Sequence, residues 1–71
     1  MKLPRDVSGA DAVKALRRVG FAVTRQNGSH ARLSKGGRHV TVPQHTSLAP
    51  KTLQSILKQA GIGFEEFLRA L

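Results

Sequence analysis

The sequence contains no cysteine, no tyrosine and no tryptophan, and only four of its 71 residues are acidic. Without cysteine, disulfide bonds and thiolate metal sites are excluded, and a reducing compartment is permitted. No apolar run approaches the length of about 18 residues that a membrane-spanning helix needs. The first nine residues, MKLPRDVSG, lack the apolar segment of a secretory signal. We therefore expect a cytoplasmic protein with one small domain over residues 1–71.

The scarcity of acidic residues leaves a large positive charge. Twelve Lys and Arg residues face four Asp and Glu residues, which gives a formal net charge of +8, and no carboxylate occurs between Ala12 and Phe64. This excess attracts polyanions, with nucleic acid as the first candidate and an acidic membrane surface as the second. A membrane is disfavoured because no segment combines a basic face with exposed bulky aromatic residues. A surface charged only for solubility is the simplest alternative.

The missing carboxylates also exclude several kinds of catalysis. A Ser-His-Asp arrangement, hydrolysis by paired carboxylates and carboxylate-bound magnesium all need acidic residues in the middle of the fold. Any catalysis must therefore use His, Lys, Arg, Ser, Thr and backbone groups. The spacing of His30, His39 and His45 matches no standard metal site. We expect no metal and no cofactor.

Two amphipathic helices and a short third helix are predicted. Ser8 has the character of an N-cap, and Asp11 stands in the capping-box position of a first helix. Pro50 suits the first turn of a second helix, and Gly61 suits the position just after its end. The predicted helices cover about residues 9–19, the segment TSLAPKTLQSILKQAG (residues 46–61) and the segment GFEEFLRAL (residues 63–71).

Three short strands are predicted between the first two helices. The segments FAVTR, HARLS and HVTVP are rich in β-branched residues and alternate between apolar and polar positions. A two-residue turn at Gly36-Gly37 would bring the apolar residues of the second and third strands onto one face. This register pairs Lys35 with Arg38, Ser34 with His39, Leu33 with Val40 and Ala31 with Val42.

The first hairpin needs a different turn to keep its apolar residues together. A two-residue loop at Asn27-Gly28 would place Val23 on the wrong face, because a shift of one residue reverses every side chain. We therefore expect a three-residue loop over 26–28, with Gly28 as a left-handed bulge residue. This register pairs Val23 with Ala31 and Phe21 with Leu33.

The order α-β-β-β-α followed by a short α predicts an α+β fold. The simplest architecture is a three-stranded antiparallel sheet with the helices packed on one face and a short C-terminal helix. The opposite face is left for solvent or a ligand. The residues expected on that open face are Ala22, Thr24, His30, Arg32, Ser34, His39 and Thr41.

The expected open face carries groups suited to phosphodiester chemistry. His30 should lie opposite Thr24, and His45 could come close enough to act as a second proton-transfer group. Histidine exchanges protons near neutral pH, and arginine or lysine stabilises charge that develops on a phosphate. RNA supplies its own nucleophile, the 2′-hydroxyl. A histidine beside a turn is also an ordinary surface residue, and Ser29 an ordinary first residue of a strand.

Three segments resemble the family of HicA-type mRNA interferase toxins. They are LRRVGFAVTRQNGSHARL, VTVPQH and LKQAGIGFEEF, which occur in this order and at the typical spacing. The resemblance implies a fold like that of double-stranded-RNA-binding domains and a ribonuclease activity that cleaves mRNA and arrests translation. It also implies that His30 of the Gly-Ser-His motif is the catalytic residue, and that a HicB-type antitoxin covers its face.

Seven further residues are candidates for RNA binding. The backbone N–H groups around the first turn could contact a phosphate oxygen, and the basic side chains nearby could bind others. The candidates are Gly28, Ser29, Arg32, Lys35, Arg38, His39 and His45. A non-catalytic RNA-binding module of the same fold and a protein whose basic face only docks an acidic partner remain alternatives. Cleavage-site preference, the second acid/base group and the oligomeric state stay open.

Overall fold

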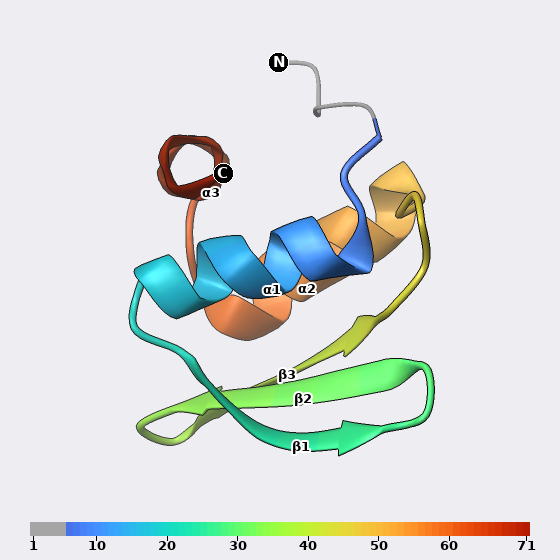
Figure 1. Ribbon diagram of the computed structural model, residues 1–71. Helices are drawn as coiled ribbons and strands as arrows, with labels where there is room; N and C mark the ends of the chain where they lie inside the picture. The colour runs from blue at the N-terminus through green and yellow to red at the C-terminus, as the bar shows by residue number, and fades with distance from the viewer. Residues whose placement is uncertain (1–5) are drawn as a thin grey trace.

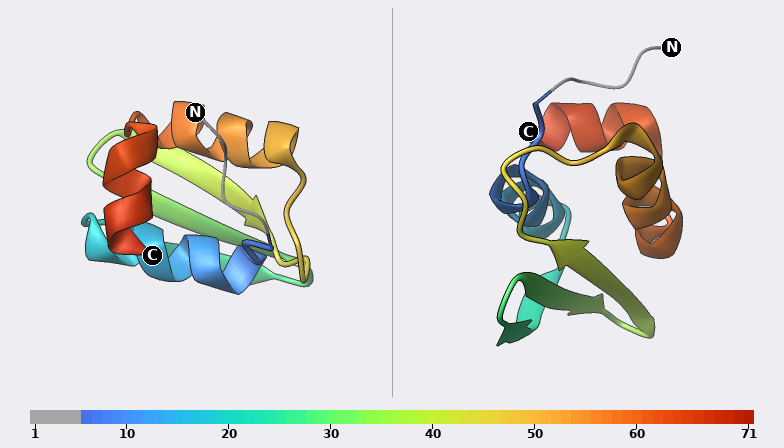
Figure 2. Two further views of the ribbon diagram at one scale, coloured as in Figure 1. Left: turned by 90° about the horizontal axis from the view of Figure 1, so that it is seen from above. Right: turned by 90° about the vertical axis from the view of Figure 1, so that its right-hand side faces the viewer.

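Residues 6–71 are described by the structure, a computed structural model, and they form one sheet covered on one face by helices (Figure 1). The elements are α1 (Gly9–Arg18), β1 (Ala22–Asn27), β2 (His30–Lys35), β3 (Arg38–Pro43), α2 (Pro50–Ala60) and α3 (Phe64–Ala70). The sheet is antiparallel in the order β1-β2-β3. Helices α1 and α2 lie over it, and α3 crosses above one end of both (Figure 2). The predicted α+β architecture is confirmed.

The ends of α1 and α2 form as the sequence predicts. Ser8 and Asp11 make a complete capping box, with Asp11 N donating to Ser8 Oγ at 3.0 Å and Ser8 N donating to Asp11 Oδ2 at 3.2 Å. Pro50 stands in the first turn of α2. N–H groups in the first turn have no partner within the helix, so the missing N–H of proline costs no hydrogen bond there. Gly61 ends α2 in the left-handed conformation, with φ of +69°. No helix within residues 6–71 has the length and apolar character to span a membrane.

The core fills the space between the sheet and the helix layer. The sheet contributes alternate residues of β2 and β3, and each long helix contributes one apolar face. The side chain of Phe67 in α3 is fully buried, so the short last helix is part of the core. The largest fully buried side chains are Phe67, Leu16, Leu33, Leu53, Ile56, Val40 and Val42.

The second hairpin has the predicted register. Lys35 pairs with Arg38 across the two-residue turn, and Leu33 pairs with Val40. Because side chains alternate along a strand, this pairing puts Leu33 and Val40 on the same face as Ala31 and Val42, and all four are buried.

The predicted register of the first hairpin is wrong. Asn27 pairs directly with His30, so the turn has two residues, Gly28 and Ser29. A type II′ turn requires a positive φ at its first central residue and a negative φ at its second. Gly28 has φ of +60°, and Ser29 is not among the residues with positive φ. A type II′ turn suits a hairpin because its twist matches that of the two strands. The extra residue that restores the register is Thr24, which lies in a bulge between Val23 and Arg25.

The apolar face of β1 is only partly buried. Phe21, just before the strand, is buried, but Val23 pairs with Leu33 instead of Ala31 and is 40% exposed. All six residues of β1 are exposed, whereas β2 and β3 each have two buried residues. The prediction that both Phe21 and Val23 are buried therefore holds only for Phe21.

Substituting Gly9 by alanine is expected to destabilise the fold by about 1–3 kcal/mol, as overpacking does. Gly9 N donates to His45 O at 2.9 Å, and a Cβ at Gly9 would collide with the carbonyl oxygen of Pro43 and lie 2.7 Å from Gln44 Cα. Both contacts are with backbone, which cannot move aside as a side chain can. Urea unfolding measures the change. Gly37→Ala is the control, since a Cβ there meets nothing within 4 Å.

Candidate functional site

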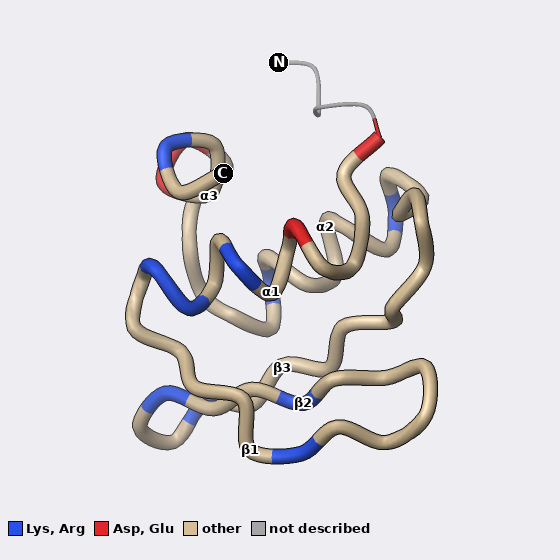
Figure 3. Tube along the Cα trace, viewed as in Figure 1, with Lys and Arg blue, Asp and Glu red and all other residues tan. Residues whose placement is uncertain are grey.

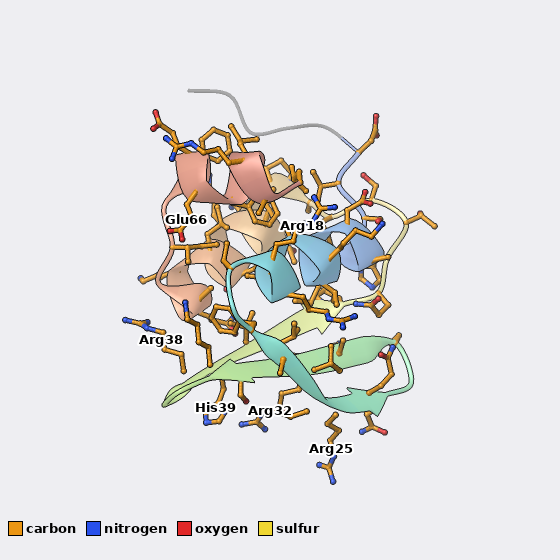
Figure 4. All side chains as sticks on the ribbon, turned by 60° about the vertical axis from the view of Figure 1, so that its left-hand side comes forward. Arg18, Arg25, Arg32, Arg38, His39 and Glu66 are labelled. Atoms are coloured by element: carbon orange, nitrogen blue, oxygen red, sulfur yellow. The ribbon has the colours of Figure 1, made fainter. Side chains whose placement is uncertain are left out.

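The face of the sheet turned away from the helices is the candidate site, and we call it the open face. The strand register arranges its residues in three rows across the sheet. The rows are Asn27–His30–Pro43, Arg25–Arg32–Thr41 and Ala22–Ser34–His39. Arg25, Arg32 and His39 point away from the helix layer (Figure 4). The described acidic residues lie on the helix side of the molecule, above the sheet (Figure 3).

An open hollow of about 180 Å³ lies over the first two rows. One imidazole, two guanidinium groups, an amide and a hydroxyl line it. Its lining residues are Arg25, Asn27, His30, Arg32 and Thr41. The hollow therefore joins an imidazole, which can accept or donate a proton, with two positively charged guanidinium groups, and this set suits an anionic ligand.

The first turn fixes the position of His30 at the rim of this hollow. His30 is the first residue of β2, directly after the type II′ turn. The turn is tied to the chain after β3, because Gln44 N donates to Ser29 O at 2.6 Å. Ser29 Oγ lies 3.4 Å from His30 Nδ1, within reach of a weak hydrogen bond. This contact engages Nδ1 and leaves Nε2 for a ligand.

Arg25 and Arg32 face each other as a directly opposed pair across β1 and β2. Like charges in this position destabilise a sheet by about 0.2–1 kcal/mol. Among residues 6–71, the one ion pair lies in α3, where Arg69 Nη2 is 3.7 Å from Glu65 Oε2. No described carboxylate therefore forms an ion pair with Arg25 or Arg32. An anion bound between the two guanidinium groups would relieve their repulsion.

Sequence reasoning missed Arg25 and Asn27. It placed Thr24 opposite His30, but the bulge at Thr24 brings Asn27 to that position and turns Arg25 outward. Thr24 Oγ1 instead donates to the carbonyl oxygen of Arg32 at 3.3 Å. The signal that could have identified both residues is the Gly-Ser dipeptide, which is a common two-residue hairpin loop.

The third row of the open face holds a paired histidine and serine. His39 faces outward as predicted, and its Nδ1 lies 2.7 Å from Ser34 Oγ on the neighbouring strand. Ser34 is half-buried and His39 is exposed.

Lys35 and Arg38 lie on the helix side of the sheet, apart from His30. Lys35 Nζ donates to the carbonyl oxygen of Val19 at 2.7 Å and lies 5.9 Å from the ring centroid of Phe21. The guanidinium of Arg38 covers Gly61, where a Cβ would be 2.5 Å from Arg38 Cζ. Their positions follow from alternation, since Lys35 shares a face with Leu33.

His45 is not among the residues that line the hollow. Its carbonyl oxygen accepts the N–H of Gly9 at 2.9 Å, and its side chain is exposed. The structure therefore does not bring His45 into the hollow beside His30. Within residues 6–71, His, Cys, Asp and Glu form no group of three or more that could hold a metal ion.

Comparisons with known proteins identify the class of this fold and then the family. A chain from a toxin–antitoxin complex of Streptococcus pneumoniae matches with a TM-score of 0.70 and 34% sequence identity, over 79% of this chain and 98% of that chain. The fold is thus that of a component of toxin–antitoxin systems. The family model described as the HicA toxin of bacterial toxin-antitoxin matches residues 9–62. The chain belongs to the HicA toxin family. No curated protein matches it.

Proposed function

We propose that this HicA toxin is an endoribonuclease that cleaves mRNA at its open face, with His30 as the catalytic residue and without a metal ion. The observation that carries the proposal is the hollow in which His30 stands beside Arg25 and Arg32. The three groups supply proton transfer and charge stabilisation, which are what cleavage of RNA needs from an enzyme. The family resemblance supports the same activity.

The reaction uses the 2′-hydroxyl of the substrate as its nucleophile. The 2′-oxygen forms a bond to the adjacent phosphorus while His30 Nε2 takes the hydroxyl proton. The bond from phosphorus to the 5′-oxygen breaks, and that oxygen is protonated, by the imidazolium or by water. The products are a 2′,3′-cyclic phosphate and a 5′-hydroxyl. Arg25 and Arg32 stabilise the charge that builds on the non-bridging oxygens.

The remaining groups of the hollow position the substrate. The Asn27 amide and the Thr41 hydroxyl can hydrogen-bond to the ribose or a base edge on either side of His30. Ser29 Oγ lies 3.4 Å from His30 Nδ1, and by engaging that nitrogen it leaves Nε2 for the substrate. Ser29 is therefore a positioning residue in this mechanism.

An antitoxin of the HicB type is the partner that we infer for this chain. The matched structure is a toxin–antitoxin complex, which supports a partner of that kind. The chain has a net charge of +8, and its open face carries basic residues without a described carboxylate. An acidic antitoxin surface would complement this face and cover His30, so that mRNA could not enter.

Purified protein is expected to cleave an unstructured mRNA fragment in excess EDTA at the same rate as in magnesium. The products should carry 5′-hydroxyl ends, which polynucleotide kinase labels directly, and 2′,3′-cyclic phosphate ends. Cleavage that stops in EDTA would contradict the metal-free mechanism. Retention of RNA without fragments would indicate the alternative function, a non-catalytic RNA-binding module.

A further inference from the structure

The Ser34–His39 pair lies on the open face but outside the hollow, and the mechanism above does not use it. His39 makes one side-chain hydrogen bond within residues 6–71, the contact of 2.7 Å to Ser34 Oγ. When the serine hydroxyl donates to Nδ1, the neutral imidazole carries its proton on Nε2. His39 then presents an N–H donor to solvent at the end of the sheet opposite the first turn.

The spacing of β2 relates this pair to the catalytic row. His30, Arg32 and Ser34 follow one another at every second residue on the same face. Two residues of a strand span about 6.8 Å, so the three rows repeat at that distance. Consecutive phosphates of an extended RNA strand repeat at a comparable distance. An RNA strand along β2 would therefore pass from His30 over Arg32 to the Ser34–His39 pair.

The surroundings of the pair leave room for a phosphate. The residue opposite Ser34 on β1 is Ala22, whose side chain is too short to cover the serine. The described acidic residues lie on the other side of the sheet (Figure 3). This row has no Phe, Tyr or Trp side chain, and the imidazole of His39 is engaged by Ser34, so we expect the pair to bind a backbone phosphate through hydrogen bonds.

We propose that Ser34 and His39 form a second phosphate subsite, which binds the RNA backbone one or two nucleotides from the cleaved linkage. The inference rests on the proposed function for the direction of the strand, and it makes His39 a substrate-positioning residue. Ser34 acts through His39 by holding its Nδ1 and keeping the Nε2 proton outward. The subsite strengthens binding of long RNA and leaves the chemical step unchanged.

Binding measured in the His30→Ala protein, which is expected to cleave RNA much more slowly, tests the subsite directly. Fluorescence anisotropy gives the affinity for a labelled dinucleotide and for unstructured oligonucleotides that extend one nucleotide at a time. His39→Ala is expected to weaken binding about tenfold, the size of a charge-assisted hydrogen bond, once the oligonucleotide reaches the third row. Dinucleotide binding should not change. Ser34→Ala should reproduce part of the same length-dependent loss.

The control variant is Lys58→Ala, which removes an exposed cation from α2 in the helix layer. It should lower affinity equally at every length. The proposal would be overturned if His39→Ala did not weaken RNA binding, or weakened it equally at every oligonucleotide length. It would also be overturned if His39→Ala weakened antitoxin binding and left RNA binding unchanged. If the wild-type protein bound RNA but did not cleave it, the proposed function would fail, while the length series would still decide the subsite.

Kinetics of the cleaving protein separate the subsite from catalysis. His39→Ala should raise KM for long RNA with kcat unchanged, as expected for an interaction made equally in the ground state and the transition state. A fall in kcat with unchanged KM would contradict the positioning role.

Discussion

His30→Ala is expected to lower the rate of RNA cleavage by a factor of about 10²–10⁴, the usual contribution of a general acid/base. The substitution should leave the fold intact, because His30 is exposed and its backbone position is set by the type II′ turn and the bond from Gln44 N to Ser29 O. Cleavage of a defined RNA, arrest of growth on expression and urea unfolding together measure the two effects. A variant that cleaved at the wild-type rate would contradict the mechanism.

His45→Ala decides whether a second histidine takes part. Since His45 does not line the hollow, we expect this variant to keep most of the cleavage rate. A loss as large as that in His30→Ala would restore His45 as the second acid/base group, and would require the segment after β3 to move when RNA binds. The pH dependence of kcat then shows whether one group or two groups titrate.

The sequence could predict the helices and the second hairpin because several signals agreed there. The Ser8–Asp11 capping box, Gly61 after α2 and the turn at Gly36-Gly37 each restrict the backbone locally. The turn at Gly36-Gly37 selects a register in which Leu33 faces Val40 and Ala31 faces Val42. Local turn chemistry and core burial therefore pointed to the same answer.

The first hairpin could not be predicted in the same way, because burial alone does not locate a bulge. One extra residue anywhere between Val23 and His30 keeps Val23 on the helix side. Its position decides which of the intervening side chains face outward, and a bulge at Thr24 instead of Gly28 turns Arg25 and Asn27 to the open face. The wrong bulge position therefore left the predicted core almost unchanged, but it assigned the wrong side chains of β1 to the open face.

The positions of Lys35 and Arg38 could have been predicted from the sequence. The register of the second hairpin, which was correct, places both on the face of Leu33 and Val40. The assignment of both residues to RNA binding stays a prediction, but they lie on a different face from His30. In the structure Lys35 Nζ donates to the carbonyl oxygen of Val19 at the end of α1, on the face opposite the hollow.

Arg32→Gln is expected to reduce kcat/KM by about 10²–10³, the loss seen when one preorganised donor to a developing oxyanion is removed. Arg32 lies in the central strand between His30 and Ser34, and it lines the hollow in which the proposed mechanism places the phosphate. Lys58→Gln, which removes one charge from α2, should have a much smaller effect. Equal losses in the two variants would mean that Arg32 acts only through the net charge.

Arg25→Gln should separate stability from activity at the same site. Removing one of two opposed like charges is expected to raise the free energy of unfolding by about 0.2–1 kcal/mol, while cleavage falls because the anion site loses half of its fixed charge. Since both arginines would contact one phosphate, the effect of the double variant on kcat/KM should be smaller than the product of the single effects. A variant that lost activity and stability together would show that Arg25 has a structural role, and the repulsion argued for this pair would be wrong.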